Sequence, residues 1–159
     1  EAIEAILHAD VVVLGPGSLY TSIIPNLLIP GFAEAIATTP ALCVYVCNVM
    51  TQPGETDGYT ASDHVQALLE HLGEPSLLDY VIVNKAGVSS AQAKKYAQQG
   101  AHPVRADISV IERMGIKVHA ADVLDQRNLV RHASLKLAEE IIRLAESRDK
   151  GKHPGIRAV

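Results

Sequence analysis

Residues able to bind a phosphate gather in one short stretch near the start of the chain. The apolar run Val11–Leu14 is broken by the letters GPG, and hydroxyl-bearing residues follow at once. Glycine lets backbone N–H groups approach a phosphate closely, and the start of a helix adds partial positive charge. The stretch therefore predicts a loop that binds a phosphate-bearing ligand. Its candidate ligand-binding residues are Gly15, Gly17, Ser18, Thr21, Ser22 and Asn26.

The same residue types also build a tight turn followed by a helix cap, and spacing alone leaves this alternative open. The stretch is not a Walker A loop because no GK[ST] follows, and it lacks the third glycine of the dinucleotide-binding fingerprint. In open α/β sheets, however, ligands bind just beyond the carboxyl ends of the strands, and this stretch lies at such an end.

A second polar stretch follows another apolar run, Ala41–Cys47. Its candidate ligand-binding residues are Asn48, Thr51, Gln52, Glu55 and Thr56. Asn and Gln offer the paired donor and acceptor edges that suit a uracil or sugar hydroxyls, and Glu55 can accept a hydrogen bond from a hydroxyl. A loop that satisfies its own backbone is the alternative. Glu55 is the only carboxylate in this set, so a paired acid and base mechanism has little support and no catalytic residue is assigned.

The histidines and cysteines predict neither a metal site nor a disulfide. His64 and His71 lie on one predicted helix, ~10 Å apart along its axis, which is too far to share an ion. Cys43 and Cys47 lie on one face of a predicted strand, about 13 Å apart, and a disulfide needs roughly half that Cα separation. Free thiols indicate a reducing compartment, so we expect a cytoplasmic protein.

The composition predicts one domain with a core of its own. The chain has 159 residues, of which 48% are hydrophobic and 20% are charged. The net charge is −4 and Lys and Arg are scattered until the last dozen residues, so the basic patch of a nucleic-acid binder is missing. The longest apolar runs are far shorter than the ~20 residues that a membrane helix needs, so no membrane span is expected.

Apolar runs alternate with segments of helical spacing, which predicts an α/β fold with βαβ units and a mostly parallel sheet. The predicted strands are 11–14, 41–48, 79–84 and 116–123. The predicted helices are the segment before residue 10, then 31–37, 62–72, 91–99, 107–114 and 135–145. Ser62 is the predicted N-cap of helix 62–72. Residues 1–146 are predicted to form the domain and residues 147–159 a basic, disordered tail.

Two long motifs carry a family resemblance. GPGSLYTSIIPNLL and YVCNVMTQPGETDGYTASDHVQALLEH resemble the YvcK/GlmR family of gluconeogenesis factors, which is related to the 2-phospho-L-lactate transferase CofD. The resemblance implies a Rossmann-like three-layer sandwich. It also implies a cytoplasmic, homo-oligomeric regulator that binds a nucleotide-sugar such as UDP-N-acetylglucosamine, or an NADP-like nucleotide. Such a regulator links carbon metabolism to cell-wall precursor supply and cell shape, with a cell-wall precursor enzyme as partner.

The resemblance also assigns roles near the C-terminus. An Arg-His pair stands at residues 131–132, and the family's Arg is associated with the diphosphate of the nucleotide-sugar, so the ligand-binding role is carried over to Arg131 alone. Ser134 matches a position open to regulatory phosphorylation, and a helix N-cap is its alternative role. Family members carry a further N-terminal half with a glycine-rich loop. Residues 1–146 therefore resemble the C-terminal half of such a domain, and part of the ligand cleft would come from the other half.

An enzyme of the CofD type is the alternative function. It would transfer a phospholactyl group from a nucleotide diphosphate carrier to a deazaflavin acceptor, and it would require a divalent metal. Those transferases follow the strand with a GPSNP-like sequence. This chain keeps Ser22, Ile23 and Pro25 of that pattern but reads GPGSLYT in front of them, which favours the regulator. A module that binds only proteins is a third possibility.

Overall fold

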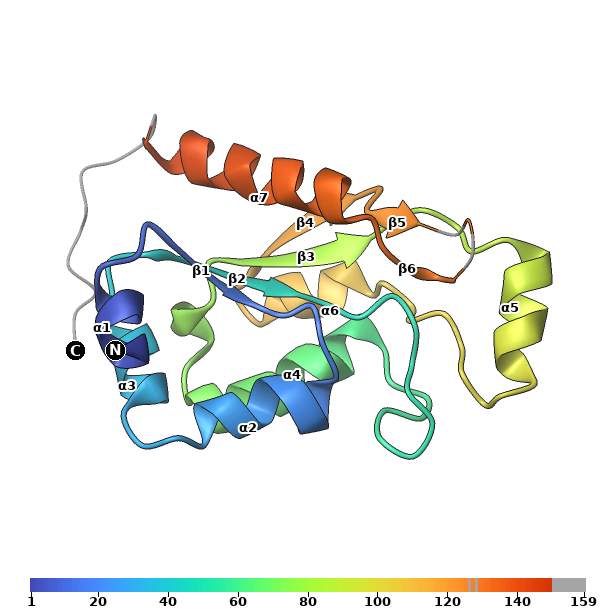
Figure 1. The fold of residues 1–159 in the computed structure, drawn as a ribbon, viewed down its shortest axis with the longest axis horizontal. Helices are drawn as coiled ribbons and strands as arrows, with labels where there is room; N and C mark the ends of the chain where they lie inside the picture. The colour runs from blue at the N-terminus through green and yellow to red at the C-terminus, as the bar shows by residue number, and fades with distance from the viewer. Residues whose placement is uncertain (126, 128, 150–159) are drawn as a thin grey trace.

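A four-stranded parallel sheet lies at the centre of the computed structural model, which describes residues 1–125, 127 and 129–149 (Figure 1). Its strands, in spatial order, are β1 (Val11–Leu14), β2 (Leu42–Val46), β3 (Tyr80–Asn84) and β4 (Lys117–Ala121). The register pairs Tyr45 of β2 with Val81 of β3, and Val81 with Val118 of β4. The expected α/β class, the four strands and their parallel order are confirmed.

Helices cover both faces of this sheet and produce three layers (Figure 1). The helices are α1 (Ala2–Leu7), α2 (Ile24–Leu27), α3 (Phe32–Thr38), α4 (Ala61–Leu72), α5 (Ser90–Ala97), α6 (Ile108–Arg113) and α7 (Ser134–Asp149). One face carries α1 to α4 and α6, whereas α7 lies across the other face (Figure 1). Helix α5 stands beyond the carboxyl ends of the strands, away from both layers (Figure 1). The layers are consistent with the expected Rossmann-like sandwich.

Strand β2 shows why these residues form a buried strand. All five of its residues are buried, because a parallel strand covered on both faces has no solvated side. Cys43 and Tyr45 point into the cluster under α4 and α6, while Val44 and Val46 point into the cluster under α7. Cys43 and Cys47 share one face, as expected, and both are buried.

The start of α4 corrects the predicted cap. Ser62 is not the N-cap, because the helix begins at Ala61 and is capped by Thr60. The Thr60 side chain accepts a hydrogen bond from the amide of Asp63, and the Asp63 carboxylate accepts one from the amide of Thr60 over 2.8 Å. This reciprocal capping box uses Asp where Glu or Gln is usual. The Ser62 hydroxyl instead donates to Asp107 Oδ2 over 2.6 Å and fastens α4 to the residue before α6.

The segment between β1 and β2 contains no long regular helix, because Pro25 and Pro30 interrupt helical hydrogen bonding. Leu19–Ile23 forms a π-helical turn, which continues into the single turn of α2, and α3 follows after Gly31.

No single helix within the described ranges is long and apolar enough to cross a membrane. The bent pair Leu19–Leu27 and Phe32–Thr38, at 73°, passes that test by length and composition alone.

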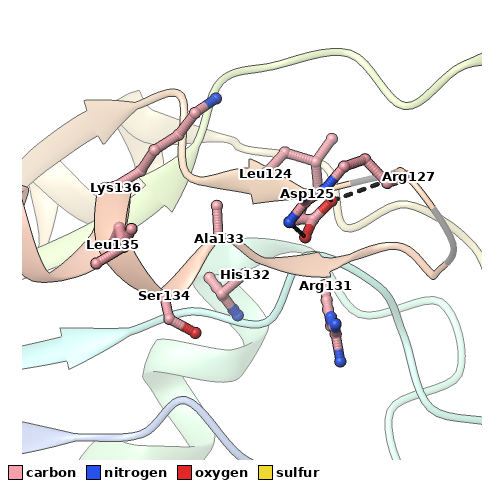
Figure 2. A pocket seen from close by; sticks show the side chains of 9 residues that line it. All are labelled: Leu124, Asp125, Arg127, Arg131, His132, Ala133, Ser134, Leu135 and Lys136. Carbon is pink, nitrogen blue, oxygen red and sulfur yellow. Dashed lines mark hydrogen bonds and ion pairs between the residues drawn. The ribbon is translucent and has the colours of Figure 1, made fainter.

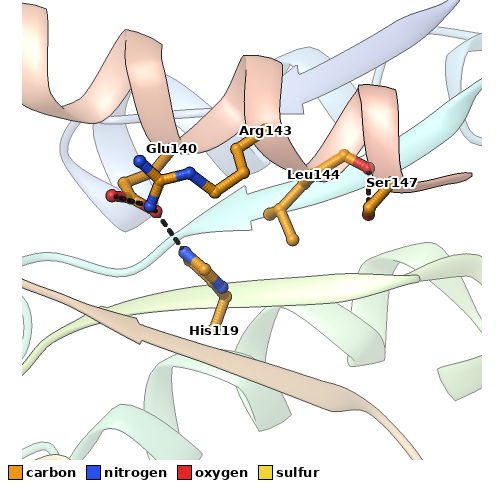
Figure 3. A network of polar contacts seen from close by, with 5 residues as sticks. All are labelled: His119, Glu140, Arg143, Leu144 and Ser147. Carbon is orange, nitrogen blue, oxygen red and sulfur yellow. Dashed lines mark hydrogen bonds and ion pairs between the residues drawn. The ribbon is translucent and has the colours of Figure 1, made fainter.

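Helix α7 is longer than predicted and is fixed to the edge strand β4 by polar contacts. It runs to Asp149, so the first three residues of the predicted tail are helical, and residues 150–159 lie outside the described part. His119 Nε2 lies 2.6 Å from Glu140 Oε2, and Arg143 donates to both Glu140 oxygens over 2.9 and 3.1 Å (Figure 3). The contact with His119, aided by the charge of Arg143, lowers the pKa of Glu140. The His119–Glu140 contact joins α7 to β4, and the Arg143 bonds fix the Glu140 carboxylate within the helix.

Tyr45→Phe is expected to stabilise the fold by about 1 kcal/mol. The Tyr45 hydroxyl is fully buried and has no hydrogen-bond partner among the residues described, so removing it removes an uncompensated desolvation cost. Urea unfolding checks this, with Tyr96→Phe as the matched control. The Tyr96 hydroxyl accepts the amide of Val130 over 3.0 Å, so its loss should destabilise by about 1 kcal/mol. A clear loss of stability in Tyr45→Phe would contradict the argument.

Candidate functional site

A groove of about 230 Å³ lies at the carboxyl ends of β1 and β2. Its walls come from the loop after β1, the loop after β2, and the short strand β6 (Arg131–His132), which pairs antiparallel with β5 (Leu124–Asp125). The residues that line it are Pro16, Gly17, Ser18, Asn48, Val49, Met50, Gln52, Val130, Arg131 and His132. The fold therefore brings together five predicted site residues from three separate segments.

A chain of side-chain hydrogen bonds joins the two loops inside this groove. The Asn48 amide donates to Gln52 Oε1 over 3.3 Å, and the Gln52 amide donates to the Ser18 hydroxyl over 2.7 Å. Asn48 Oδ1 is buried and has no hydrogen-bond partner in the described part of the chain. A buried acceptor without a partner costs free energy, which marks Asn48 as an unusual residue of this wall.

Thr51 and Thr56 build the loop and do not line the groove. Thr51 Oγ1 accepts the amide of His102 over 2.9 Å, and Thr56 Oγ1 accepts the amide of Gln52 over 2.9 Å. Both threonines are buried. Their hydroxyls hold the loop in the shape that presents Gln52, which is the backbone-satisfying role left open by the sequence.

Thr21 and Glu55 also lie outside the groove, where they face each other across the two loops. Thr21 Oγ1 lies 3.4 Å from Glu55 Oε1, and beside them the hydroxyls of Tyr20 and Tyr59 are 2.8 Å apart. Their hydrogen bond and partial burial raise the pKa of Tyr20 to about 12. Glu55 Oε2 is buried without a partner among the described residues. These pairs connect the loops next to the groove.

Three further predicted residues face a different hollow. Gly15, Ser22 and Asn26 line a mainly apolar groove of about 370 Å³ beside the edge strand β1, and Gly17 borders both grooves. The Asn26 amide donates to the backbone carbonyl of Ser22 over 2.6 Å. The predicted ligand-binding set is therefore divided between two grooves and the loop interior.

Arg131 is the cation of the site. It is exposed, and no carboxylate among the described residues forms an ion pair with it. Figure 2 shows Arg131, His132 and Ser134 extending to one side of the β5–β6 ribbon, while Arg127 and Lys136 extend away from that side. Arg127 donates to Asp125 over 3.1 and 2.9 Å and holds the pKa of that carboxyl well below its usual range. The guanidinium N–H groups of Arg131 are therefore able to donate hydrogen bonds to an anion.

His132 is a residue of the groove that the sequence reasoning left out. Its Nε2 lies 3.1 Å from the backbone carbonyl of Cys47, and burial lowers its pKa. Its place directly after Arg131 is the signal that could have identified it, because both residues belong to one two-residue strand at the edge of the groove.

Ser134 is exposed at the start of α7, and the alternative N-cap role is wrong. The helix begins at Ser134 itself, and the carbonyl of Ala133 accepts the amide of Leu137 over 2.9 Å. Ala133 therefore occupies the cap position.

Within the described residues, no group of three or more His, Cys, Asp or Glu side chains is placed to hold a metal ion.

Known proteins are similar to this chain over most of its length. The family model described as 2-phospho-L-lactate transferase CofD matches residues 1–124. A gluconeogenesis factor of Halalkalibacterium halodurans is 48% identical over 143 residues, which is 89% of this chain and 44% of that protein. A gluconeogenesis factor of Bacillus subtilis is 43% identical over 145 residues, 91% of this chain and 45% of that protein.

Solved structures agree with these matches. Two crystal structures of a Bacillus halodurans protein, one described as a member of the UPF0052 family, superpose with TM-scores of 0.85 and 0.86 at 46% and 45% identity. Each covers 89% of this chain and 45% of the other. The chain thus spans less than half the length of these relatives and corresponds to their C-terminal part.

Proposed function

Because this chain belongs to the CofD family and resembles the gluconeogenesis factors throughout the domain, we propose that it forms part of a regulatory protein that binds a nucleotide-sugar such as UDP-N-acetylglucosamine. One observation carries the proposal. Ser18, Gln52 and Arg131 face a single groove at the carboxyl ends of β1 and β2, where ligands of open α/β sheets bind.

The groove has the chemistry that such a ligand requires. Arg131 offers a planar guanidinium that can hold phosphate oxygens with two donors. Asn48 and Gln52 line the groove with amide groups suited to a uracil edge or to sugar hydroxyls. Among the described residues that line the groove there is no carboxylate, so this part of the cleft offers no paired acid and base. These features favour binding and regulation over group transfer.

The wider role is proposed by analogy with the gluconeogenesis factors. The protein would act in the cytoplasm as a homo-oligomer and adjust the supply of cell-wall precursors, through contact with a precursor-synthesising enzyme, according to carbon metabolism. The ligand cleft would be completed by the part of the relatives' length that this chain does not cover. An NADP-like nucleotide is the competing ligand.

Ser134 is proposed as the site at which phosphorylation would control binding. It is exposed and lies on the Arg131 side of the ribbon (Figure 2). A phosphate there carries about −1.5 to −2 charges, sits favourably at a helix N-terminus, and competes with the ligand for Arg131. Ser134→Asp should therefore weaken ligand binding about three- to tenfold in calorimetric titration, at ~0.7–1.4 kcal/mol. Equal affinity in Ser134→Asp and Ser134→Ala would exclude this control.

Calorimetric titration of UDP-N-acetylglucosamine into the full-length protein tests the proposed function, with NADP and GDP as comparison ligands. We expect saturable binding of the UDP-sugar and weaker or no binding of the other two. A response to GDP alone, together with metal-dependent product formation from a deazaflavin acceptor, would instead establish a transferase. If the protein binds none of the nucleotides but still binds a partner protein, it is an interaction module.

A further inference from the structure

His132 is held in one orientation by the sheet. Its Nε2 lies 3.1 Å from the carbonyl of Cys47, and the amide of Cys47 is bound in turn to the carbonyl of Ile82 in β3. Since a carbonyl oxygen only accepts, Nε2 must carry the proton of the neutral ring. The other nitrogen, Nδ1, is then a hydrogen-bond acceptor whose direction is fixed by the fold.

The surroundings of His132 keep this imidazole neutral. Burial lowers its pKa, and it forms no ion pair with a carboxylate of the described residues. On its own strand it adjoins the cation Arg131, and on β5 the carboxylate of Asp125 is already bound by Arg127. The Cys47 thiol stays protonated, because burial raises its pKa to about 12. The ammonium group of Lys136 extends away and is bound to Asp122 over 2.9 Å (Figure 2).

The position of His132 puts this acceptor next to Arg131. His132 lines the groove at the strand ends and also a larger, open cavity of about 820 Å³ at the start of α7. It lies between Arg131 and Ser134 in sequence, and all three side chains extend to the same side of the ribbon (Figure 2). A ligand whose phosphate is held by Arg131 would therefore meet a neutral acceptor beside that phosphate.

We infer that His132 is a second ligand-recognition residue, whose Nδ1 accepts a hydrogen bond from a hydroxyl close to the anionic group bound by Arg131. This inference rests on the proposed function and narrows it, because it requires a ligand with a hydroxyl next to a phosphate, as in a nucleotide-sugar. Sulfate would meet Arg131 but offers His132 no donor, because it is fully ionised near neutral pH.

Two substitutions distinguish a role of His132 in ligand recognition from a role in stabilising the fold, because each preserves one nitrogen position of the imidazole ring. His132→Gln can keep the donor to the Cys47 carbonyl but loses the acceptor at Nδ1. His132→Asn can place an acceptor where Nδ1 lay but loses the donor to Cys47. In full-length protein titrated with UDP-N-acetylglucosamine, we expect His132→Gln to keep its urea midpoint and to lose affinity about tenfold. We expect His132→Asn to unfold at lower urea and to keep its affinity within about threefold.

The pH dependence of binding gives an independent readout. Protonation turns Nδ1 from an acceptor into a donor, so the affinity of the unaltered protein should fall as pH drops below the usual imidazole value of 6.5. That acid loss should be absent in His132→Gln. Sulfate, used as a second probe without a hydrogen-bond donor, should bind equally to the unaltered protein and to His132→Gln.

The outcomes separate the two proposals. If the unaltered protein binds the UDP-sugar and Arg131→Ala weakens it, but His132→Gln retains full affinity and the acid loss, then His132 only supports the ribbon and this inference is wrong. If the unaltered protein binds no nucleotide-sugar, the proposed function fails and this inference fails with it.

Discussion

Gly15→Ala is expected to lower the free energy of unfolding by about 2–4 kcal/mol, for two physical reasons that add. Gly15 has φ +91°, a region that L-residues rarely adopt. In addition, a Cβ built there would lie 3.1 Å from the backbone oxygen of Val46 and 3.2 Å from Cδ1 of Ile23. The Ile23 side chain can rotate away, but Val46 belongs to the fully buried strand β2 and its backbone cannot yield.

Gly54→Ala provides the matched control for that prediction. Gly54 also has positive φ, at +81°, but nothing lies within 4 Å of its would-be Cβ. The Gly54→Ala substitution should lower the free energy of unfolding by only about 1 kcal/mol, because only the backbone conformation is strained. Urea unfolding of both variants measures the difference. Equal losses of unfolding free energy in Gly15→Ala and Gly54→Ala would show that the close approach to Val46 does not add to the cost, because the loop can move away from β2.

The strands were predictable because burial on both faces leaves a direct mark on composition. The apolar run Leu42–Val46 has the same signature whatever the rest of the fold does, since a parallel strand under two helical layers must be apolar throughout. Helices α4 and α6 likewise follow from apolar spacing. Their bounds differ from the predicted ones by one residue, as when α4 begins at Ala61 under the Thr60 cap and α6 ends at Arg113.

The ribbon that presents Arg131 could not be predicted from local residues. Strands β5 and β6 have only two residues each, too few for a periodic pattern. Their positions are fixed by distant partners: the amide of Val130 donates to the Tyr96 hydroxyl, and the amide of Ala133 donates to the carbonyl of Val123. Long-range bonds of this kind leave no trace in the spacing of neighbouring residues.

The division of the predicted site has the same cause. Residue type indicated that the two loops could bind polar groups, but not which hydroxyls were already used. The Thr51 hydroxyl accepts the amide of His102, which is 51 residues away. Gln52, by contrast, reaches Ser18 on the other loop and forms a wall of the groove. Which polar residues face the ligand is therefore a property of the tertiary fold.

Arg131→Ala is expected to weaken UDP-sugar binding by the full-length protein about 10- to 100-fold, which is ~1.4–2.7 kcal/mol. Arg131 is exposed, lines the groove and forms no ion pair within the described residues, so its removal disturbs the ligand and not the fold. Arg131→Lys keeps the charge but loses the planar pair of donors, and we expect it to recover only part of the affinity. Calorimetric titration measures all three proteins.

Lys136→Ala is the control that separates a specific contact from the general effect of a lost charge. Lys136 lines the same larger cavity as Arg131 but extends to the opposite side and is bound to Asp122 (Figure 2). Lys136→Ala should leave affinity nearly unchanged, because its ammonium group is already paired with Asp122 and exposed charges are screened by salt. Equal losses in Arg131→Ala and Lys136→Ala would mean that the ligand senses only the positive field of the ribbon. Unchanged affinity in Arg131→Ala would remove this residue from the site and leave the groove without its anion-binding group.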